Sequence, residues 1–183
     1  EGKQGVAVAG THGKTTTTAM IVSILLAAGR DPTFVVGGVL AGLETNARAG
    51  KEPLFVIEAD EYDCTFLSLT PDVAVVTNVE HDHPDCYPTF DDFCEAFEAF
   101  VGLVPDNGLL AVCWDDPAAR QIGERQVDAK PVTFFGLEEG AAWRAEEIST
   151  NFAGGIDFLA VHDGQTLGLV RLRVPGAHNA SNA

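Results

Sequence analysis

The chain has 183 residues, of which 46% are hydrophobic and 8% aromatic, which excludes a disordered protein and allows one large domain or two small ones. Eleven basic residues against 27 acidic ones give a formal charge of −16, which argues against nucleic-acid binding and against polybasic docking to membranes. The longest apolar run, at residues 19–28, is too short to cross a bilayer, so no transmembrane segment is expected.

The negative charge is concentrated in one stretch. Residues 52–119 hold sixteen Asp and Glu and neither Lys nor Arg, whereas the rest of the chain holds eleven acids and eleven bases. Such acidic stretches are most often solvated surfaces. A functional explanation therefore needs motifs within the stretch.

The four cysteines favour a reduced, cytoplasmic setting. Cys64, Cys86, Cys94 and Cys113 form no CxxC pair, and no secretory signal precedes them, so we expect free, buried thiols. A structural zinc site is the less favoured alternative, because the spacing from Cys86 to Cys94 does not suit a zinc knuckle. The chain begins without Met and ends within a pattern, which is typical of an excised fragment.

The apolar pattern predicts strands that alternate with helices. Short runs of β-branched and aromatic residues indicate buried strands, and apolar residues at helical spacing after Phe90 indicate an amphipathic helix. Gly29 and Pro32 end the first helix. The expected elements are a strand at 5–9, a helix at 14–28, strands at 34–36, 54–57 and 73–77, a helix at 90–104, a strand at 109–113, a short helix at 116–123 and a strand at 132–135.

The pattern changes after Gly140. Residues 143–149, 156–162 and 167–174 alternate and are joined by glycine-containing turns, which predicts three antiparallel strands. The expected fold class is α/β, a P-loop-type, mostly parallel sheet flanked by helices, with a small antiparallel β appendage near the C-terminus. We expect one domain over 1–183, with its core at 1–140, the antiparallel strands at 141–175 and the start of a junction at 175–183.

A phosphate-binding loop is the sharpest motif. Residues 10–16, GTHGKTT, lie between an expected strand and an expected helix, where glycines let backbone N–H groups approach an anion beside the positive end of the helix dipole. Lys14 is placed to reach phosphates, and the Thr15 hydroxyl to hold Mg²⁺. The spacing is shorter than the full Walker motif, whose leading glycine would fall at Val8.

The acidic stretch contains a candidate metal site. One strand delivers EADE at 58–61 and another delivers NVEHDH at 78–83, and the carboxyl ends of parallel strands meet at one edge of a sheet. Carboxylates and nucleotide phosphates suit Mg²⁺. A metal or phosphate role is favoured for His83, whereas His81 is expected to be solvated. Asp60, Asp63 and Asp85 fit either a supporting or an exposed role.

With both elements in place, the chain resembles the central, ATP-binding domain of the Mur ligases. Three blocks in order carry the resemblance, namely GTHGKTTTTAM (10–20), EADEYDCTFLSLTPDVAVVTNVEHDHPDCY (58–87) and PGAHNASNA (175–183). The resemblance implies an ATP-dependent amide-bond ligase of peptidoglycan precursor synthesis, which adds L-alanine to UDP-N-acetylmuramate through an acyl phosphate. It implies ATP and Mg²⁺ as cofactors and leaves the oligomeric state open.

The resemblance also implies roles for individual residues. Lys14 would bind the phosphates, Thr15 one magnesium ion, and Glu58 and His83 a second. The nucleotide site would include Gly10, Thr11, His12, Gly13 and Thr16 of the loop, with His178, Asn179 and Asn182 near the adenine. From the residues alone, Asn179 and Asn182 fit a turn and a helix cap equally well.

The sequence departs from the family pattern in two respects. Many members carry a carbamoylated lysine after the histidine motif, but residues 84–104 contain no lysine, so Glu95 or Glu98 is a candidate replacement. The family's amino-terminal and carboxy-terminal domains are outside this sequence, so we expect the fragment to be inactive alone. Alternatives are a ligase that recycles murein tripeptide, the more distant folylpolyglutamate and cyanophycin ligases, a P-loop kinase or NTPase, and a non-catalytic nucleotide-binding module.

Overall fold

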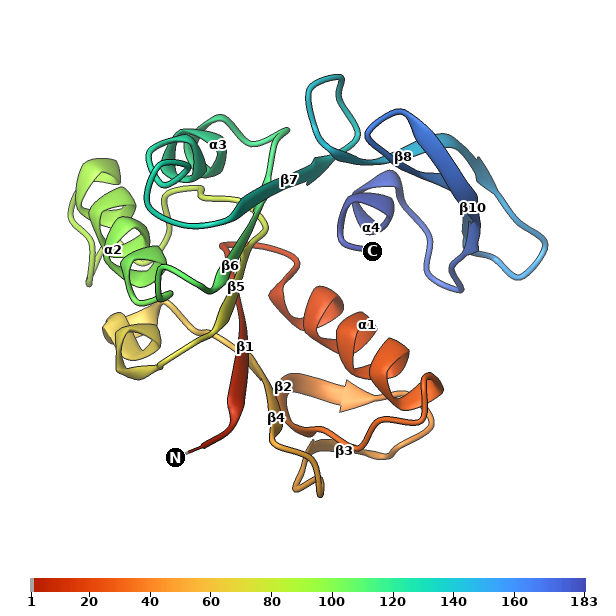
Figure 1. Ribbon diagram of the computed structural model, residues 1–183, viewed down its shortest axis with the longest axis horizontal. Helices are drawn as coiled ribbons and strands as arrows, with labels where there is room; N and C mark the ends of the chain where they lie inside the picture. Colours follow the sequence, from red (N-terminus) through yellow and green to blue (C-terminus); the bar gives the residue numbers. More distant parts are fainter. Residues whose placement is uncertain (1) are drawn as a thin grey trace.

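The computed structural model describes residues 2–183 as one ten-stranded sheet with helices on both faces (Figure 1). The strand order is β10-β9-β8-β7-β6-β5-β1-β4-β2-β3. The first six strands of the parallel series are β1 (Gln4–Ala9), β2 (Thr33–Leu40), β4 (Leu54–Glu58), β5 (Val73–Val76), β6 (Leu109–Cys113) and β7 (Val132–Gly136). β1 lies between β4 and β5, so its carboxyl end is central. The predicted α/β fold class is confirmed.

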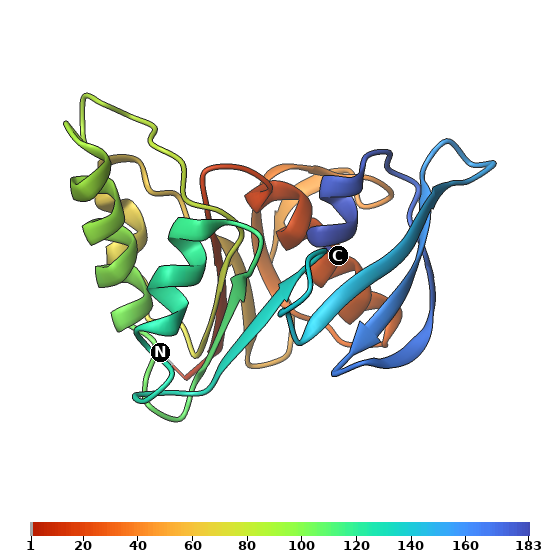
Figure 2. The same cartoon turned by 90° about the horizontal axis from the view of Figure 1, so that it is seen from above.

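Helices cover both faces of the parallel strands (Figure 2). The helix α1 (Lys14–Ala27) packs on one face through the buried Val22, against Phe34 and Val56. On the other face lie α2 (Phe90–Gly102), α3 (Pro117–Glu124) and the 3₁₀ segment η1 (Tyr62–Ser68). These three elements enclose the larger core, which is rich in phenylalanine.

Local sequence explains where two of these helices begin. Thr89 and Asp92 form a reciprocal capping box at the start of α2. Asp116 caps α3 through the backbone N–H of Ala119, and Pro117 occupies its first position, where its missing N–H costs nothing. Both starts agree with the sequence expectations to within one residue.

The C-terminal strands are antiparallel, as predicted, but they continue the main sheet. They are β8 (Trp143–Thr150), β9 (Ile156–His162) and β10 (Gln165–Arg171), followed by α4 (Ala177–Ser181). β8 joins β7 in parallel through only two register pairs, Phe135 with Trp143 and Gly136 with Arg144. The last strand is shifted toward the N-terminus relative to the expected 167–174, because pairing with β9 begins at Gln165, directly after the turn at Asp163-Gly164.

Several sequence expectations need correction. The short strand β3 (Thr45–Arg48), which pairs antiparallel with β2, was not expected, nor was η1. Val35 is 41% exposed, so β2 is not buried on both faces. All four cysteines are free, but Cys64 is exposed where a buried thiol was expected. Among the described residues, no helix is long and apolar enough to cross a membrane.

Candidate functional site

The phosphate loop follows the carboxyl end of β1 and leads directly into α1. Gly10 has a φ of 139°, and a Cβ at this position would overlap Thr77 Oγ1. Gly13 caps α1 in the left-handed conformation with a φ of 85°, and a Cβ there would lie 2.7 Å from Asn182 Oδ1. Both positions therefore require glycine for conformation and for space. The loop presents the N-terminus of a fourteen-residue helix, a favourable environment for an anion.

Residues after β5 hold this loop in place. His12 N donates to Asn78 Oδ1 at 2.8 Å, and Asn78 Nδ2 donates back to His12 O at 2.9 Å. Thr77 Oγ1 donates to His12 O at 2.6 Å, and Thr11 N donates to Asn78 O at 3.2 Å. The Thr11 hydroxyl donates to Glu80 O and accepts from Glu80 N. The loop conformation is thus fixed by hydrogen bonds that span more than sixty residues of sequence.

Lys14 is fully engaged by acceptors within the site. Its Nζ donates to Gly10 O at 2.6 Å, to Thr11 O at 3.3 Å and to Glu61 Oε1 at 2.9 Å. The side chains of this ion pair are 14% exposed for Lys14 and 1% for Glu61. An ammonium group has three protons, so these three acceptors satisfy it.

Thr15 and Glu58 form the second polar contact of the site. Thr15 Oγ1 donates to Glu58 Oε1 at 2.9 Å, and Gly37 N donates to Glu58 Oε2 at 2.6 Å. A Cβ on Gly37 would lie 2.8 Å from Glu58 Oε2, so glycine in β2 permits this approach. Two of the three residues expected to contact magnesium, Thr15 and Glu58, are therefore adjacent.

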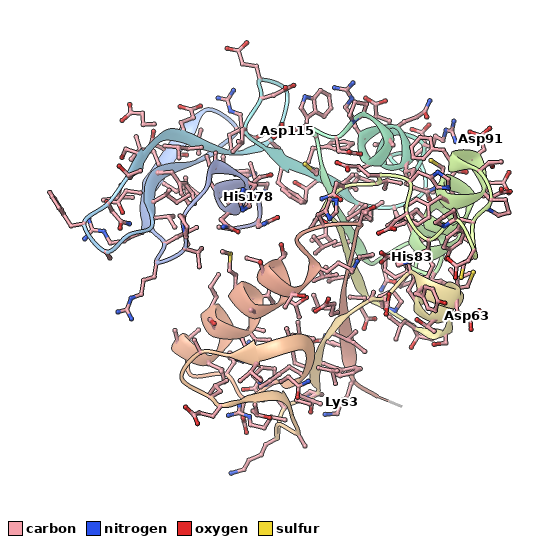
Figure 3. All side chains as sticks on the ribbon, turned by 180° about the vertical axis from the view of Figure 1, so that it is seen from behind. Lys3, Asp63, His83, Asp91, Asp115 and His178 are labelled. Atoms are coloured by element: carbon pink, nitrogen blue, oxygen red, sulfur yellow. The ribbon has the colours of Figure 1, made fainter. Side chains whose placement is uncertain are left out.

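Glu61 and His83 lie beside Lys14. Glu61 Oε1 is 3.7 Å from His83 Nε2, and the ring of His83 meets that of Tyr62 edge-on at a centroid distance of 5.0 Å. Glu61 Oε2 is buried and has no hydrogen-bond partner among the described residues. His83 lies near Asp63 on the η1 side of the molecule (Figure 3).

The backbone around this pair is unusual. Asp63, Cys64 and His83 all have positive φ, between 51° and 55°, which is uncommon for residues other than glycine. Tyr87 OH donates to the backbone carbonyl of Glu61, and burial raises the pKa of Tyr87 well above its ordinary value. The phenol therefore keeps its proton and remains a donor to the segment that carries Glu61.

The C-terminal motif reaches the phosphate loop through α4. Asn179 Nδ2 donates to Pro175 O at 2.6 Å, and Asn182 Nδ2 donates to Asn179 Oδ1 at 3.3 Å. Asn182 also lies against Gly13, whereas His178 is exposed on α4 (Figure 3). Asn182 follows the last helical residue, so its position agrees with the helix-end alternative and also places its amide at the loop.

The structure brings most of the expected site residues to one edge of the sheet. The loop residues 10–16, Glu58, His83 and Asn182 gather there, and Thr16 lies in the first turn of α1 without a side-chain bond among the described residues. Sequence reasoning included Glu61 and Asn78 in the two strand-end clusters without giving either a contact, and it missed the contributions of Gly37 and Thr77. Gly37 lies one residue beyond the strand expected at 34–36, and only the longer observed strand β2 makes it a strand glycine that marks a close approach by another group.

Neither candidate replacement for the family's lysine lies in this site. Glu98 pairs with Arg125, and Glu95 is exposed on α2. His81 is exposed, as expected, and its Nε2 lies 2.8 Å from Tyr87 O. The Glu95 and Glu98 hypothesis is therefore not supported by any contact of the described residues.

The donor set suits magnesium, although no ready-made cluster is present. Residues 2–183 contain no group of three or more His, Cys, Asp or Glu side chains arranged to hold a metal ion. Thr15 Oγ1 nevertheless donates to the Glu58 carboxylate, and His83 lies beside Glu61, the partner of Lys14, at the loop that the sequence predicts to bind phosphate. Hard oxygen donors completed by phosphate oxygens are what Mg²⁺ prefers, and the orphaned oxygen of Glu61 adds another.

Comparison with known proteins gives a consistent picture. The family model described as Mur ligase middle domain matches residues 8–183. The chain is 48% identical to the UDP-N-acetylmuramate–L-alanine ligase of Chromobacterium violaceum and 46% identical to that of Burkholderia lata, in each case over 99% of this chain. It spans 39% and 38% of the length of these relatives.

Solved structures agree in fold. The UDP-N-acetylmuramate:L-alanyl-γ-D-glutamyl-meso-diaminopimelate ligase from Neisseria meningitidis is 34% identical, with a TM-score of 0.85 over 99% of this chain and 59% of that one. The UDP-N-acetylmuramate–alanine ligase from Thermotoga maritima is 28% identical, with a TM-score of 0.83 over 98% of this chain and 39% of that one.

Proposed function

Because this chain belongs to the Mur ligase family, as its middle domain, we propose that it is the ATP-binding part of a ligase that joins L-alanine to UDP-N-acetylmuramate. The observation that carries the proposal is the phosphate loop, already formed and flanked by Lys14 and the Thr15–Glu58 pair. The names of the relatives support the choice of substrates.

The proposed phosphate site consists of residues 10–16. Backbone N–H groups at the start of α1 would contact the phosphates, together with the ammonium of Lys14. Thr15, Glu58 and His83 would hold magnesium. Bound there, Mg²⁺ would neutralise the phosphate charge that otherwise repels an incoming carboxylate.

The proposed reaction has two stages. The lactyl carboxylate of UDP-N-acetylmuramate attacks the γ-phosphorus of ATP, and ADP leaves, which gives an acyl phosphate. The amine of L-alanine then attacks the acyl carbon to form a tetrahedral intermediate, loses a proton, and expels phosphate to give the amide. The contribution of Lys14 is to hold negative oxygens at a fixed position while two anions approach each other.

The other end of the nucleotide would meet the C-terminal motif. Asn182 lies against Gly13, so α4 is adjacent to the loop that would hold the phosphates. We assign His178, Asn179 and Asn182 to the nucleoside side of the site on this basis. The chain matches about two fifths of its curated relatives, and we assign the UDP-sugar and amine sites to the parts that lie outside that match.

The domain assignment follows from the same reasoning. We treat residues 1–183 as one domain, with a parallel core at 1–140, antiparallel strands at 141–175 and a junction beginning at 175. A ligase that adds a murein tripeptide is the second candidate, because the Neisseria ligase shares the fold at 34% identity. An assay of a full-length ligase with each amine in turn separates the two candidates.

Calorimetry of the chain with a non-hydrolysable ATP analogue and Mg²⁺ tests the proposal. Binding is expected, and Lys14→Ala should weaken it by roughly 10- to 100-fold, because a charge-assisted hydrogen bond to phosphate is lost. Lys51→Ala, at an exposed lysine away from the loop, is the matched control and should leave the affinity unchanged. A folded chain that does not bind at millimolar nucleotide contradicts the nucleotide-binding assignment.

A further inference from the structure

Glu61 has an environment that a purely structural role does not explain. Its side chain is 1% exposed, and Oε1 lies between Lys14 Nζ at 2.9 Å and His83 Nε2 at 3.7 Å. Its second oxygen, Oε2, is buried without a hydrogen-bond partner among residues 2–183. A buried carboxylate oxygen without a donor is strongly unfavourable. This carboxylate therefore has one oxygen that receives no hydrogen bond within residues 2–183, although its other oxygen binds Lys14 of the phosphate loop.

Other carboxylates of the molecule show the contrast. Asp115 accepts from Leu137 N through one oxygen and from Glu138 N through the other. Glu58 likewise uses both oxygens, one for Thr15 and one for Gly37. Within the described part of the chain, Glu61 Oε2 is the only buried carboxylate oxygen left without a donor.

The contacts of Lys14 show what must change when an anion arrives. All three protons of its ammonium are taken by Gly10 O, Thr11 O and Glu61 Oε1. A phosphate oxygen can bind the ammonium only by replacing one of these acceptors or by sharing a proton with it. Either change weakens the ion pair between Lys14 and Glu61. A buried carboxylate without a paired positive charge destabilises the folded state.

We infer that Glu61 exchanges Lys14 for the divalent cation when the nucleotide binds, and that it thereby couples metal binding to nucleotide binding. This inference rests on the proposed function, because it takes the phosphate loop as a nucleotide site. Two carboxylates, at positions 58 and 61, lie at this site beside the single ammonium of Lys14. Additional positive charge is therefore required once Lys14 turns toward phosphate, and Oε2, which has no donor within the described residues, offers a hard oxygen ligand for it.

The test measures the affinity for a non-hydrolysable ATP analogue with EDTA and with Mn²⁺, and takes the ratio of the two. In the unmodified chain the metal should tighten binding strongly. Glu61→Gln keeps the shape but removes the charge, so the tightening by metal should fall by roughly tenfold or more. Binding with EDTA should stay the same or become tighter, because no buried negative charge is left behind by Lys14.

Asp63→Asn is the matched control. It removes the same charge two residues away, at an exposed position with a φ of 51°, which asparagine accepts readily. In Asp63→Asn, the ratio of the affinities measured with Mn²⁺ and with EDTA should equal that of the unmodified chain. An unchanged ratio in Glu61→Gln overturns the inference, and so does a loss of affinity that is equal with and without metal, because Glu61 would then only position Lys14. If the unmodified chain binds no nucleotide, the proposed function fails and the inference fails with it.

A second measurement needs no nucleotide. Lys14→Met frees both oxygens of Glu61, so Mn²⁺ should bind this variant more tightly than the unmodified chain, as measured by water-proton relaxation. Adding Glu61→Gln should abolish the gain, whereas adding Asp63→Asn should preserve it. If Glu61→Gln and Asp63→Asn change the Mn²⁺ affinity of Lys14→Met equally, that affinity depends only on the overall charge. This result would overturn the assignment of Glu61.

Discussion

The parallel and antiparallel halves of the sheet differ in how they are covered. The parallel strands carry α1 on one face and α2, α3 and η1 on the other, and they enclose most of the fully buried side chains. The antiparallel strands have a small core of Ala145, Ile156 and Phe158 with Ala180 from α4. β10 is largely exposed, with Leu167 at 55% and Leu169 at 62%.

The halves also differ in where they gather polar groups. In the parallel half, β1, β4 and β5 all end at the same edge, so Lys14, Glu58 and Asn78 come together although they are distant in sequence. Antiparallel neighbours end at opposite edges and cannot do this. The C-terminal half instead contributes Asn182, through the short helix that follows its strands. The direction of the strands, more than their number, thus determines where polar side chains can come together to form a site.

Gly10→Ala should produce the largest effect on the parallel half. The new Cβ would overlap Thr77 Oγ1, and a φ of 139° is strained for alanine, so we expect a loss of about 2–5 kcal/mol in the free energy of unfolding. Nucleotide affinity should fall below detection, because the loop N–H groups move. Urea unfolding and calorimetry measure the two effects.

Gly102→Ala is its control within the same half. Gly102 ends α2, has open space where a Cβ would lie, and is not at positive φ. Alanine should therefore leave binding intact and raise the free energy of unfolding by about 0.5–1 kcal/mol. If Gly10→Ala changes the free energy of unfolding and the nucleotide affinity as little as Gly102→Ala does, the phosphate loop does not pack as closely against Thr77 as described.

Two phenylalanine-to-alanine variants test whether the parallel and antiparallel halves of the sheet unfold separately. Phe97 is fully buried between α2 and the parallel strands, so Phe97→Ala should cost about 3–5 kcal/mol and speed amide exchange throughout the sheet. Phe158 belongs to the small core beneath α4. Phe158→Ala should speed exchange mainly in β8–β10, because those strands join β7 through only two register pairs. Uniform acceleration in both variants would show a single cooperative unit.

Lys130 provides a smaller, pH-dependent test in the parallel half. Its buried Nζ donates to Val101 O and Val104 O at the end of α2, so Lys130→Met should cost about 1–3 kcal/mol at pH 7. Burial lowers the pKa of Lys130 below the ordinary 10.5. The unfolded chain therefore holds the proton more tightly, and stability should rise as the pH increases toward 10.5.

Lys130→Met has no ammonium at this position to titrate. The part of the increase in stability with pH that comes from Lys130 should therefore be absent from this variant. Unfolding by urea at a series of pH values measures it. Lys51→Met, at an exposed lysine, should keep the slope of the unmodified chain. A slope that is unchanged in Lys130→Met would contradict the assignment of the pH dependence to this buried ammonium.

Sequence reasoning worked where a local pattern determines the structure. The apolar runs and the glycine loop were sufficient to place Lys14 and Thr15 at a helix start and Glu58 at a strand end. The same reasoning predicted antiparallel strands after Gly140. It did not predict that they extend the main sheet, because the two register pairs with β7 are a tertiary contact that leaves no local pattern.

The residues missed in the site act through long-range contacts. Glu61 was recognised only as one of several acids, because its burial depends on η1 and on Tyr87, which is twenty-six residues away. Gly37 donates to Glu58 across two strands, and Asn78 bonds His12 across sixty-six residues. Residue type and spacing do not encode such pairings in a single sequence. The strained Asp63, Cys64 and His83 were hidden for the same reason.

The clamp of Asn78 and Thr77 on the phosphate loop has a kinetic consequence. The loop loses its conformational freedom when the chain folds, so an arriving anion does not need to order it. Association should then proceed at the rate of a rigid site and vary little among variants that keep the clamp. Differences in affinity among those variants should appear in the dissociation rate, and thus in the residence time of the ligand.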